Sequence, residues 1–173
     1  LGDRAYAAAK LGDPTLNFAL PSGYKNLQFE DGDIGDRYKL TADGFADTQA
    51  VRPGASNYQI VSQYLLPYSD ALTFTQKIFY TTNSLSILLP DVGVTLSGGG
   101  FTDMGVRDIQ GTKFRTYTSN GAKAGDVIKF DLKGKPTLNA NAAAPSSTTD
   151  TTTALIGGLA LGLALSIVAL YYW

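Results

Sequence analysis

The sequence predicts an all-β protein, an antiparallel immunoglobulin-like β-sandwich followed by a single C-terminal transmembrane α-helix. Three observations support this prediction. Apolar and polar residues alternate in short runs, turn residues separate these runs about every ten residues, and residues 154–173 contain no charge and no proline. Alternation with period two, rich in β-branched and aromatic residues, is typical of antiparallel strands. A sandwich is the favoured arrangement, and a closed barrel is the alternative.

The alternating runs lie between residues 15 and 134 and are separated by turns such as Pro-Ser-Gly, Asp-Gly-Asp and Arg-Pro-Gly. The expected strands, in chain order, are residues 15–20, 24–30, 36–41, 45–51, 57–66, 72–80, 84–89, 92–97, 113–118 and 126–133. The two clearest runs place Leu72, Phe74, Gln76, Ile78 and Tyr80 on one face, and Ile128, Phe130 and Leu132 on another. The alanine-rich residues 3–11 could form either a short helix or a loop.

Composition divides the chain into three segments. Residues 1–138 form the expected sandwich domain. Residues 139–153 consist almost entirely of Asn, Ala, Pro, Ser and Thr, so we expect an extended stalk with little to bury. Residues 154–173 are apolar throughout, and a helix of this length spans about 30 Å, the thickness of a bilayer core. Because the chain begins at Leu1 and shows no signal peptide, we expect its start to differ from the start of translation.

The expected membrane helix has two internal features. Small residues recur every fourth position and predict a helix-packing stripe; they are Ala154, Gly158, Gly162 and Ser166. Aromatic residues at the end predict membrane-interface anchors; they are Tyr171, Tyr172 and Trp173. The alternative for the stripe is that glycine and alanine are simply common in membrane helices.

The composition also excludes function classes. The chain has no cysteine and no histidine, so it lacks a thiolate nucleophile, the usual proton shuttle and the commonest ligands of zinc, copper and haem. We therefore predict no enzyme activity, no cofactor and no metal. The formal net charge of −1 argues against nucleic acid as a partner and against electrostatic binding to anionic lipid.

Several motifs resemble binding sites, and each has a simpler interpretation. The acidic run from Asp31 to Asp36, with Asp43 and Asp47 beyond it, suggests calcium, but its order differs from an EF-hand, and solvated turn carboxylates explain it better. Residues 97–100, Ser-Gly-Gly-Gly, could be a phosphate loop, but no helix follows, so a turn or bulge between strands is expected. The chain has one glutamate, Glu30, and no motif that pairs two carboxylates for hydrolysis.

Aromatic side chains are frequent and allow two interpretations. The residues in question are Tyr58, Tyr64, Tyr68, Phe74, Phe79 and Tyr80. They could form a sugar-binding platform, although packing in the core explains them more simply.

Seven short motifs carry a resemblance to a known family. They are residues 26–30 (Asn-Leu-Gln-Phe-Glu), 43–48 (Asp-Gly-Phe-Ala-Asp-Thr), 52–54 (Arg-Pro-Gly), 66–68 (Leu-Pro-Tyr), 88–94 (Leu-Leu-Pro-Asp-Val-Gly-Val), 110–112 (Gln-Gly-Thr) and 124–126 (Ala-Gly-Asp). Together they resemble a family of membrane-anchored β-sandwich proteins of green non-sulfur (Chloroflexi-type) bacteria, in which this module follows a carboxypeptidase-regulatory-like domain. The resemblance implies a single-pass protein of the bacterial cell membrane. By analogy, it also implies an accessory subunit of an electron-transport assembly such as alternative complex III.

The resulting functional prediction is a non-catalytic accessory or structural subunit of a bacterial membrane complex. Its β domain is expected on the periplasmic, extracytoplasmic side, because Ser/Thr/Pro stalks are common there. Its expected partners are the lipid bilayer and other membrane protein subunits. The rival is a cell-surface binding module that recognises glycan or another envelope ligand, and it predicts an exposed aromatic shelf on one sheet face.

Overall fold

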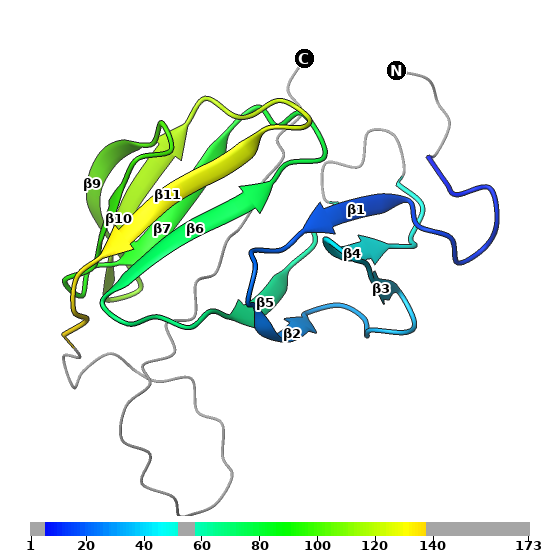
Figure 1. The fold of residues 1–173 in the computed structure, drawn as a ribbon, viewed down its shortest axis with the longest axis horizontal. Helices are drawn as coiled ribbons and strands as arrows, with labels where there is room; N and C mark the ends of the chain where they lie inside the picture. The colour runs from blue at the N-terminus through cyan, green and yellow to red at the C-terminus, as the bar shows by residue number, and fades with distance from the viewer. Residues whose placement is uncertain (1–5, 52–57, 138–173) are drawn as a thin grey trace, which may run out of the picture.

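The computed structural model describes residues 6–51 and 58–137. Within these two ranges the chain forms β-strands and no helix (Figure 1). The strands are β1 (Leu16–Ala19), β2 (Lys25–Phe29), β3 (Tyr38–Leu40), β4 (Gly44–Asp47), β5 (Ser62–Leu65), β6 (Ala71–Lys77), β7 (Leu85–Pro90), β8 (Thr95–Ser97), β9 (Thr102–Ile109), β10 (Thr112–Ser119) and β11 (Val127–Lys133). Every pairing between them is antiparallel, which confirms the predicted all-β class.

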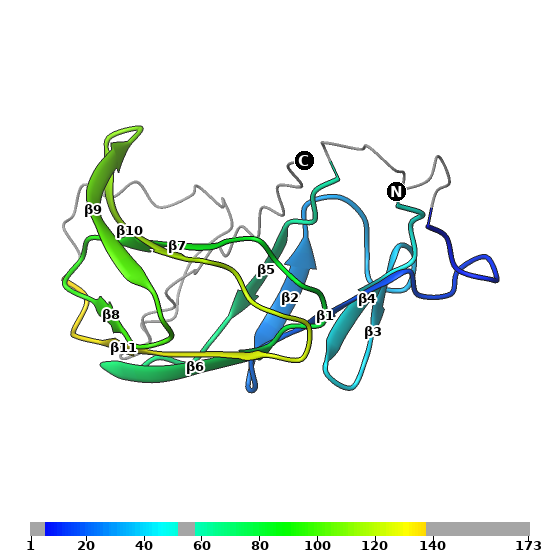
Figure 2. The same cartoon turned by 90° about the horizontal axis from the view of Figure 1, so that it is seen from above.

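The C-terminal half consists of two open three-stranded sheets that face each other, as in a β-sandwich (Figure 2). One sheet has the order β7-β10-β9 and the other β6-β11-β8. The sheets are separate, so this half is not the closed barrel considered above. The finer assignment of the sandwich as immunoglobulin-like stays a prediction.

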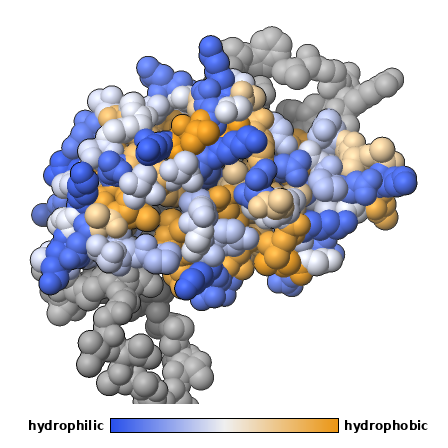
Figure 3. Space-filling view, viewed as in Figure 1, coloured by the Kyte–Doolittle hydropathy of each residue, from blue (hydrophilic) through white to orange (hydrophobic). Residues whose placement is uncertain are grey.

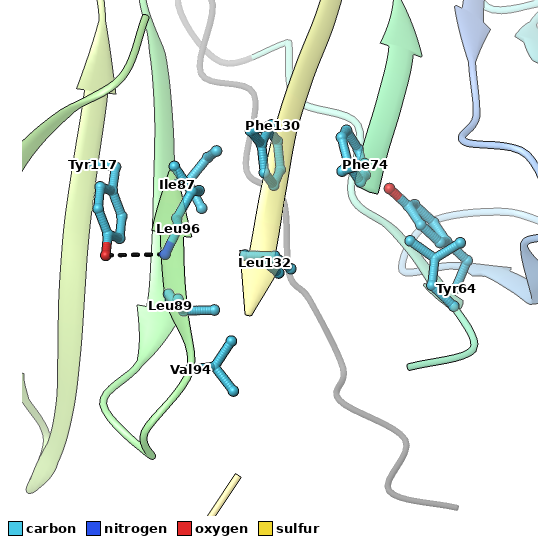
Figure 4. Close-up of a cluster of buried hydrophobic side chains, with 10 residues drawn as sticks. Tyr64, Phe74, Ile87, Leu89, Val94, Leu96, Tyr117, Phe130 and Leu132 are labelled. Atoms are coloured by element: carbon cyan, nitrogen blue, oxygen red, sulfur yellow. Dashed lines mark hydrogen bonds between the residues drawn. The ribbon is translucent and has the colours of Figure 1, made fainter. Parts of the chain in front are cut away.

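Alternating side chains of the two sheets form the main core (Figure 4). Leu85, Ile87 and Leu89 of β7 are buried, whereas Ser86 between them is exposed. The core cluster comprises Tyr64, Leu66, Phe74, Ile87, Leu89, Val94, Leu96, Tyr117, Phe130 and Leu132. The predicted alternation along β6 and β11 is therefore confirmed, with Phe74, Phe130 and Leu132 among the most buried side chains of the described residues.

The N-terminal half has a second, aromatic core. Its sheet has the order β1-β4-β3, and β2 pairs with β5 beside it. The ring of Phe29 stacks on Tyr38 with 3.7 Å between ring centroids, and Phe45 stacks on Phe18 at 5.1 Å. Phe29 also meets Phe45 edge to face at 4.8 Å, so the four rings form one continuous contact chain.

Side chains from the C-terminal half complete the outer edge of β1. This strand lies at the end of its sheet, which would leave main-chain groups without partners. The Asn17 N–H donates to the Tyr80 hydroxyl at 2.8 Å, and the Ala19 carbonyl accepts from the Gln76 side-chain amide, also at 2.8 Å. These two hydrogen bonds join the halves without a shared sheet.

Ten predicted strands have counterparts in the structure, but one strand, β9, was not predicted. Its alternation is interrupted at Gly105, which has a positive φ of 84°. The pairing with β10 shifts between Arg115 and Tyr117, so β9 carries an extra residue there, a β-bulge. The prediction for residues 97–100 is confirmed as a turn between β8 and β9. Over residues 6–11 the alanine-rich segment is a loop rather than a helix.

Gly121 occupies a turn that only glycine fits. Its φ is +84°, and a Cβ there would lie 2.1 Å from the Thr82 carbonyl oxygen. We expect Gly121→Ala to lower the free energy of unfolding by more than about 1 kcal/mol, because the backbone must move as well as bear strain. Urea unfolding measures this. The matched control is Gly111→Ala, where φ is +82° but no atom lies within 4 Å of the added Cβ. Equal losses in the two variants would contradict the steric argument.

Candidate functional site

A buried carboxylate, Asp47, organises the main polar cluster of the described residues. Asp47 lies at the end of the central strand β4, directly opposite Leu16 of β1 and Tyr38 of β3. Its side chain is fully buried. Arg37, one residue before β3, reaches the same place from the neighbouring strand. The short β3–β4 hairpin therefore brings the two charges together.

The Asp47 carboxylate accepts hydrogen bonds from three residues. Arg37 donates from Nε to both oxygens, at 3.1 and 3.2 Å, and from Nη2 to Oδ2 at 2.7 Å. The Tyr58 hydroxyl donates to Oδ2 at 2.6 Å, and the Gln49 N–H donates to Oδ1 at 2.8 Å. Each oxygen thus accepts hydrogen bonds from at least two donors. This carboxylate therefore holds neighbouring groups of the fold together and is not available as a free base.

A second carboxylate extends the cluster towards the surface. Asp31 pairs with Nη1 of Arg37 and accepts a hydrogen bond from the Tyr38 hydroxyl at 2.9 Å. The Arg37 guanidinium also lies over the Tyr38 ring, 4.9 Å from its centroid. The interpretation of these aspartates as solvated turn carboxylates is therefore wrong for Asp47, whereas the Asp31 side chain is 51% exposed, in agreement with it. Asp47 occupies the same alternating face as the buried Phe45, which was the available sign that its charge needs a partner.

The environment shifts the ionisation of the cluster. Burial alone raises the pKa of Asp47, but the hydrogen bonds from Arg37, Tyr58 and Gln49 outweigh it, so the pKa lies below its ordinary value. Burial, followed by the hydrogen bond to Asp47, raises the pKa of Tyr58. The hydrogen bond to Asp47 is also the main cause of the raised pKa of Arg37. The carboxylate and the guanidinium therefore both remain charged at neutral pH.

This shift predicts an acid-sensitive fold. The lowered pKa of Asp47 contributes stability that is present above its unfolded pKa of about 3.9 and is lost as pH falls through the lower folded pKa. We expect the free energy of unfolding, measured by urea titration, to decline below about pH 4. Asp47→Asn should have a lower stability at pH 7 and a shallower decline in acid. Parallel pH curves for the two proteins would contradict this assignment.

An open groove lies where the two halves meet. Its volume is about 430 Å³, and it is lined by Asn17, Thr41, Ala42, Asp43, Phe79 and Tyr80, which we call the Tyr80 groove. Its walls are the β3–β4 turn, the β1 strand and the segment after β6. The turn is held by the Thr41 N–H donating to the Gly44 carbonyl at 2.9 Å, and by the Leu20 N–H donating to the Asp43 carbonyl at 2.9 Å.

A smaller cavity of about 30 Å³ lies inside the sandwich. Phe74, Ile87 and Phe130 are among its lining residues, and its surface is almost entirely apolar. An apolar void of this size offers no hydrogen-bond partners to a water molecule or a polar ligand. We interpret it as a packing void.

Strand β9 presents a third surface feature. It pairs only with β10 among the described strands and is therefore an open edge, at the left of Figure 1. Met104, Val106 and Ile109 on it are 50%, 41% and 41% exposed. Arg115 of β10 pairs with Asp103 at 2.9 Å, and Asp103 also accepts from the Gly105 N–H at 2.8 Å. On the face drawn in Figure 3, apolar residues are interspersed with hydrophilic ones.

The predicted aromatic platform separates into different places. Tyr64 and Phe74 belong to the core, as the simpler interpretation holds, and burial raises the pKa of Tyr64 to about 12. Tyr68 donates to the Gly134 carbonyl at 2.6 Å, and Tyr58 binds Asp47. Phe79 and Tyr80 line the Tyr80 groove, and Tyr80 is 41% exposed. The six residues therefore do not form one shelf.

The predicted membrane residues lie outside the described ranges. These are Ala154, Gly158, Gly162 and Ser166 of the packing stripe, and the anchors Tyr171, Tyr172 and Trp173. Residues 6–51 and 58–137 contain no helix with the length and apolar character needed to cross a bilayer. In the same two ranges, no three acidic side chains are grouped closely enough to hold a metal ion.

Comparison with known proteins identifies no relative of this chain. No family model matches the chain, and comparisons with curated proteins and with solved structures yield no match. The resemblance to membrane-anchored β-sandwich proteins of green non-sulfur bacteria, and the link to alternative complex III, stay predictions.

Proposed function

We propose that this chain is a non-catalytic accessory subunit of a bacterial membrane complex, with electron transport the class of complex that the sequence resemblance favours. In this proposal residues 154–173 cross the membrane, and the β head lies on the extracytoplasmic side and docks against partner subunits. The helix confines the head to the membrane plane, so the effective concentration of head and partner is high and even a small docking surface suffices.

The open edge of β9 is the observation that best supports docking. An edge strand presents main-chain donors and acceptors that can pair with another chain, and natural proteins normally protect such edges. Here Met104, Val106 and Ile109 add exposed apolar surface along the strand. Asp103 precedes them on the strand, and Arg107 and Asp108 lie between Val106 and Ile109; these charges disfavour indiscriminate pairing. This combination suits a specific partner surface.

The charged side chains of the main buried cluster support a structural role. Arg37 and Asp47 form an ion pair with each other and hydrogen bonds with neighbouring groups of the fold. Arg115 is likewise engaged with Asp103. These groups hold strands together and are not arranged around a space that could receive a substrate.

The test uses the full chain in its native membrane. After mild detergent extraction, native gels and mass spectrometry should show the chain co-migrating with other membrane subunits. We expect Gly158→Leu combined with Gly162→Leu to release it from the complex while it still resists alkaline extraction from membranes. Val106→Lys should weaken the same complex through the head.

The matched control for the head is Val127→Lys. Val127 is 57% exposed and lies on β11, away from the β9 edge. It should leave co-migration unchanged. If wild-type chain migrates alone, or if neither the helix variant nor Val106→Lys changes co-migration, the proposal is wrong.

A further inference from the structure

We infer that the Tyr80 groove is a binding site for a neutral carbohydrate residue. This inference does not depend on the proposed accessory role, because the residues that line the groove belong neither to β9 nor to residues 154–173. The groove volume of about 430 Å³ lies within the range of small-molecule sites, roughly 300–1,000 Å³. Its chemistry identifies the class of ligand.

The groove combines aromatic surface with polar groups that are free to bind. Phe79 and Tyr80 supply rings, and an exposed ring can pack against the C–H face of a sugar. Asn17, Thr41 and Asp43 supply an amide, a hydroxyl and a carboxylate. Within residues 6–51 and 58–137, the side chains of these three make no hydrogen bond or ion pair. They offer both donors and acceptors, as a rim of sugar hydroxyls requires.

The charge of the lining argues against other ligands. Asp43 is the charged residue among the lining side chains, and no lysine or arginine lines the groove. A phosphate or a nucleic acid would meet a repelling carboxylate in the groove, and the nearby Lys77 ammonium is already engaged over the Phe79 ring, 5.3 Å from its centroid. A neutral polyhydroxylated ring can instead donate a hydroxyl proton to that carboxylate, a charge-assisted and therefore strong hydrogen bond.

The groove is also held in place before any ligand arrives. The Tyr80 hydroxyl accepts from the Asn17 N–H at 2.8 Å, so its own proton remains available for a ligand. The Tyr80 ring lies 6.4 Å from that of Phe18, and Lys77 lies over the Phe79 ring at 5.3 Å. The opposite wall is a hairpin turn closed by main-chain bonds. Binding therefore requires little ordering of the protein.

The experiment measures binding of neutral trisaccharides of glucose, of mannose and of N-acetylglucosamine to the full chain in detergent. Saturation-transfer NMR detects contact, and calorimetry gives Kd. We expect at least one trisaccharide to bind, and we expect Asp43→Ala and Tyr80→Ala each to weaken it about tenfold or more. Tyr80→Phe keeps the ring and should weaken binding less than Tyr80→Ala.

The matched control is Tyr6→Ala, because Tyr6 is an exposed tyrosine that does not line the groove. It should change Kd by less than about twofold. Because Tyr80 also bridges the two halves, a Tyr80→Ala protein that fails to fold leaves the decision to Asp43→Ala and Thr41→Val at the exposed turn. If none of the three trisaccharides binds, or if Asp43→Ala and Thr41→Val bind as wild type does, the inference is overturned.

Discussion

Replacing Asp47 by alanine should lower the free energy of unfolding by about 3–5 kcal/mol. The substitution leaves the Arg37 guanidinium, whose side chain is only 17% exposed, without its principal partner, and it removes the acceptor of Tyr58 and of the Gln49 N–H. Because a domain has a total stability of only about 5–15 kcal/mol, this single change should bring the protein close to unfolding at room temperature. Urea unfolding followed by circular dichroism measures the loss.

Two controls separate the burial of this ion pair from the mere loss of a charge. Asp103→Ala breaks the ion pair with Arg115. Both side chains of this pair are substantially exposed, so the loss of stability should be much smaller than for Asp47→Ala. The double variant Arg37→Met with Asp47→Leu removes both charges and should be more stable than Asp47→Ala alone. A loss for Asp47→Ala no larger than that for Asp103→Ala would show that the cluster does not stabilise the fold.

Replacing Phe130 by alanine should cost about 3–5 kcal/mol through loss of buried surface and creation of a cavity. Phe130 lies on β11, the central strand of its sheet, and is 3% exposed. Its ring stacks on Phe74 at 4.6 Å and meets Phe101 edge to face at 5.7 Å. The site borders the existing void of about 30 Å³, so the vacated volume would join space that is already unfilled.

The control for Phe130 lies on the same strand. Val127→Ala truncates a side chain that is mostly exposed and should change the free energy of unfolding by less than about 0.5 kcal/mol. The measurement is again urea unfolding, with thermal unfolding as a second probe. A Phe130→Ala protein as stable as Val127→Ala would mean that the two sheets do not share the core described here.

Local pattern predicts the strands whose two faces differ most. The face formed by Phe130 and Leu132 could be inferred from alternation alone, because one side of the strand meets the core and the other meets solvent. The turn at residues 97–100 was equally accessible, since successive glycines readily adopt the positive φ values found there. Strand β9 was not predicted because both its faces are largely exposed and its bulge breaks the alternation.

The candidate sites depended on contacts between residues far apart in the sequence. Acidic residues near turns ordinarily face water, and the one local sign that distinguishes Asp47 from Asp43 is its place in a strand, on the same face as Phe45. The hairpin places Asp47 inward against Arg37 and leaves Asp43 at an open groove. Among the six aromatic candidates, only Phe79 and Tyr80 line the groove. The sequence could not single them out, because the groove depends on the contact between β1 and the segment after β6.

Composition and periodicity alone determine that this chain builds antiparallel strands and that it has no histidine or cysteine chemistry, because these properties belong to each short segment by itself. The prediction that residues 154–173 cross a membrane is local in the same sense, because it depends only on an uninterrupted run of uncharged, mainly apolar residues. Tertiary structure decides which carboxylate is buried, which edge stays open and where a groove forms. These three features depend on the strand order and on the contact between the two halves. Both are set by interactions between residues far apart in the sequence, so no short stretch of sequence contains them.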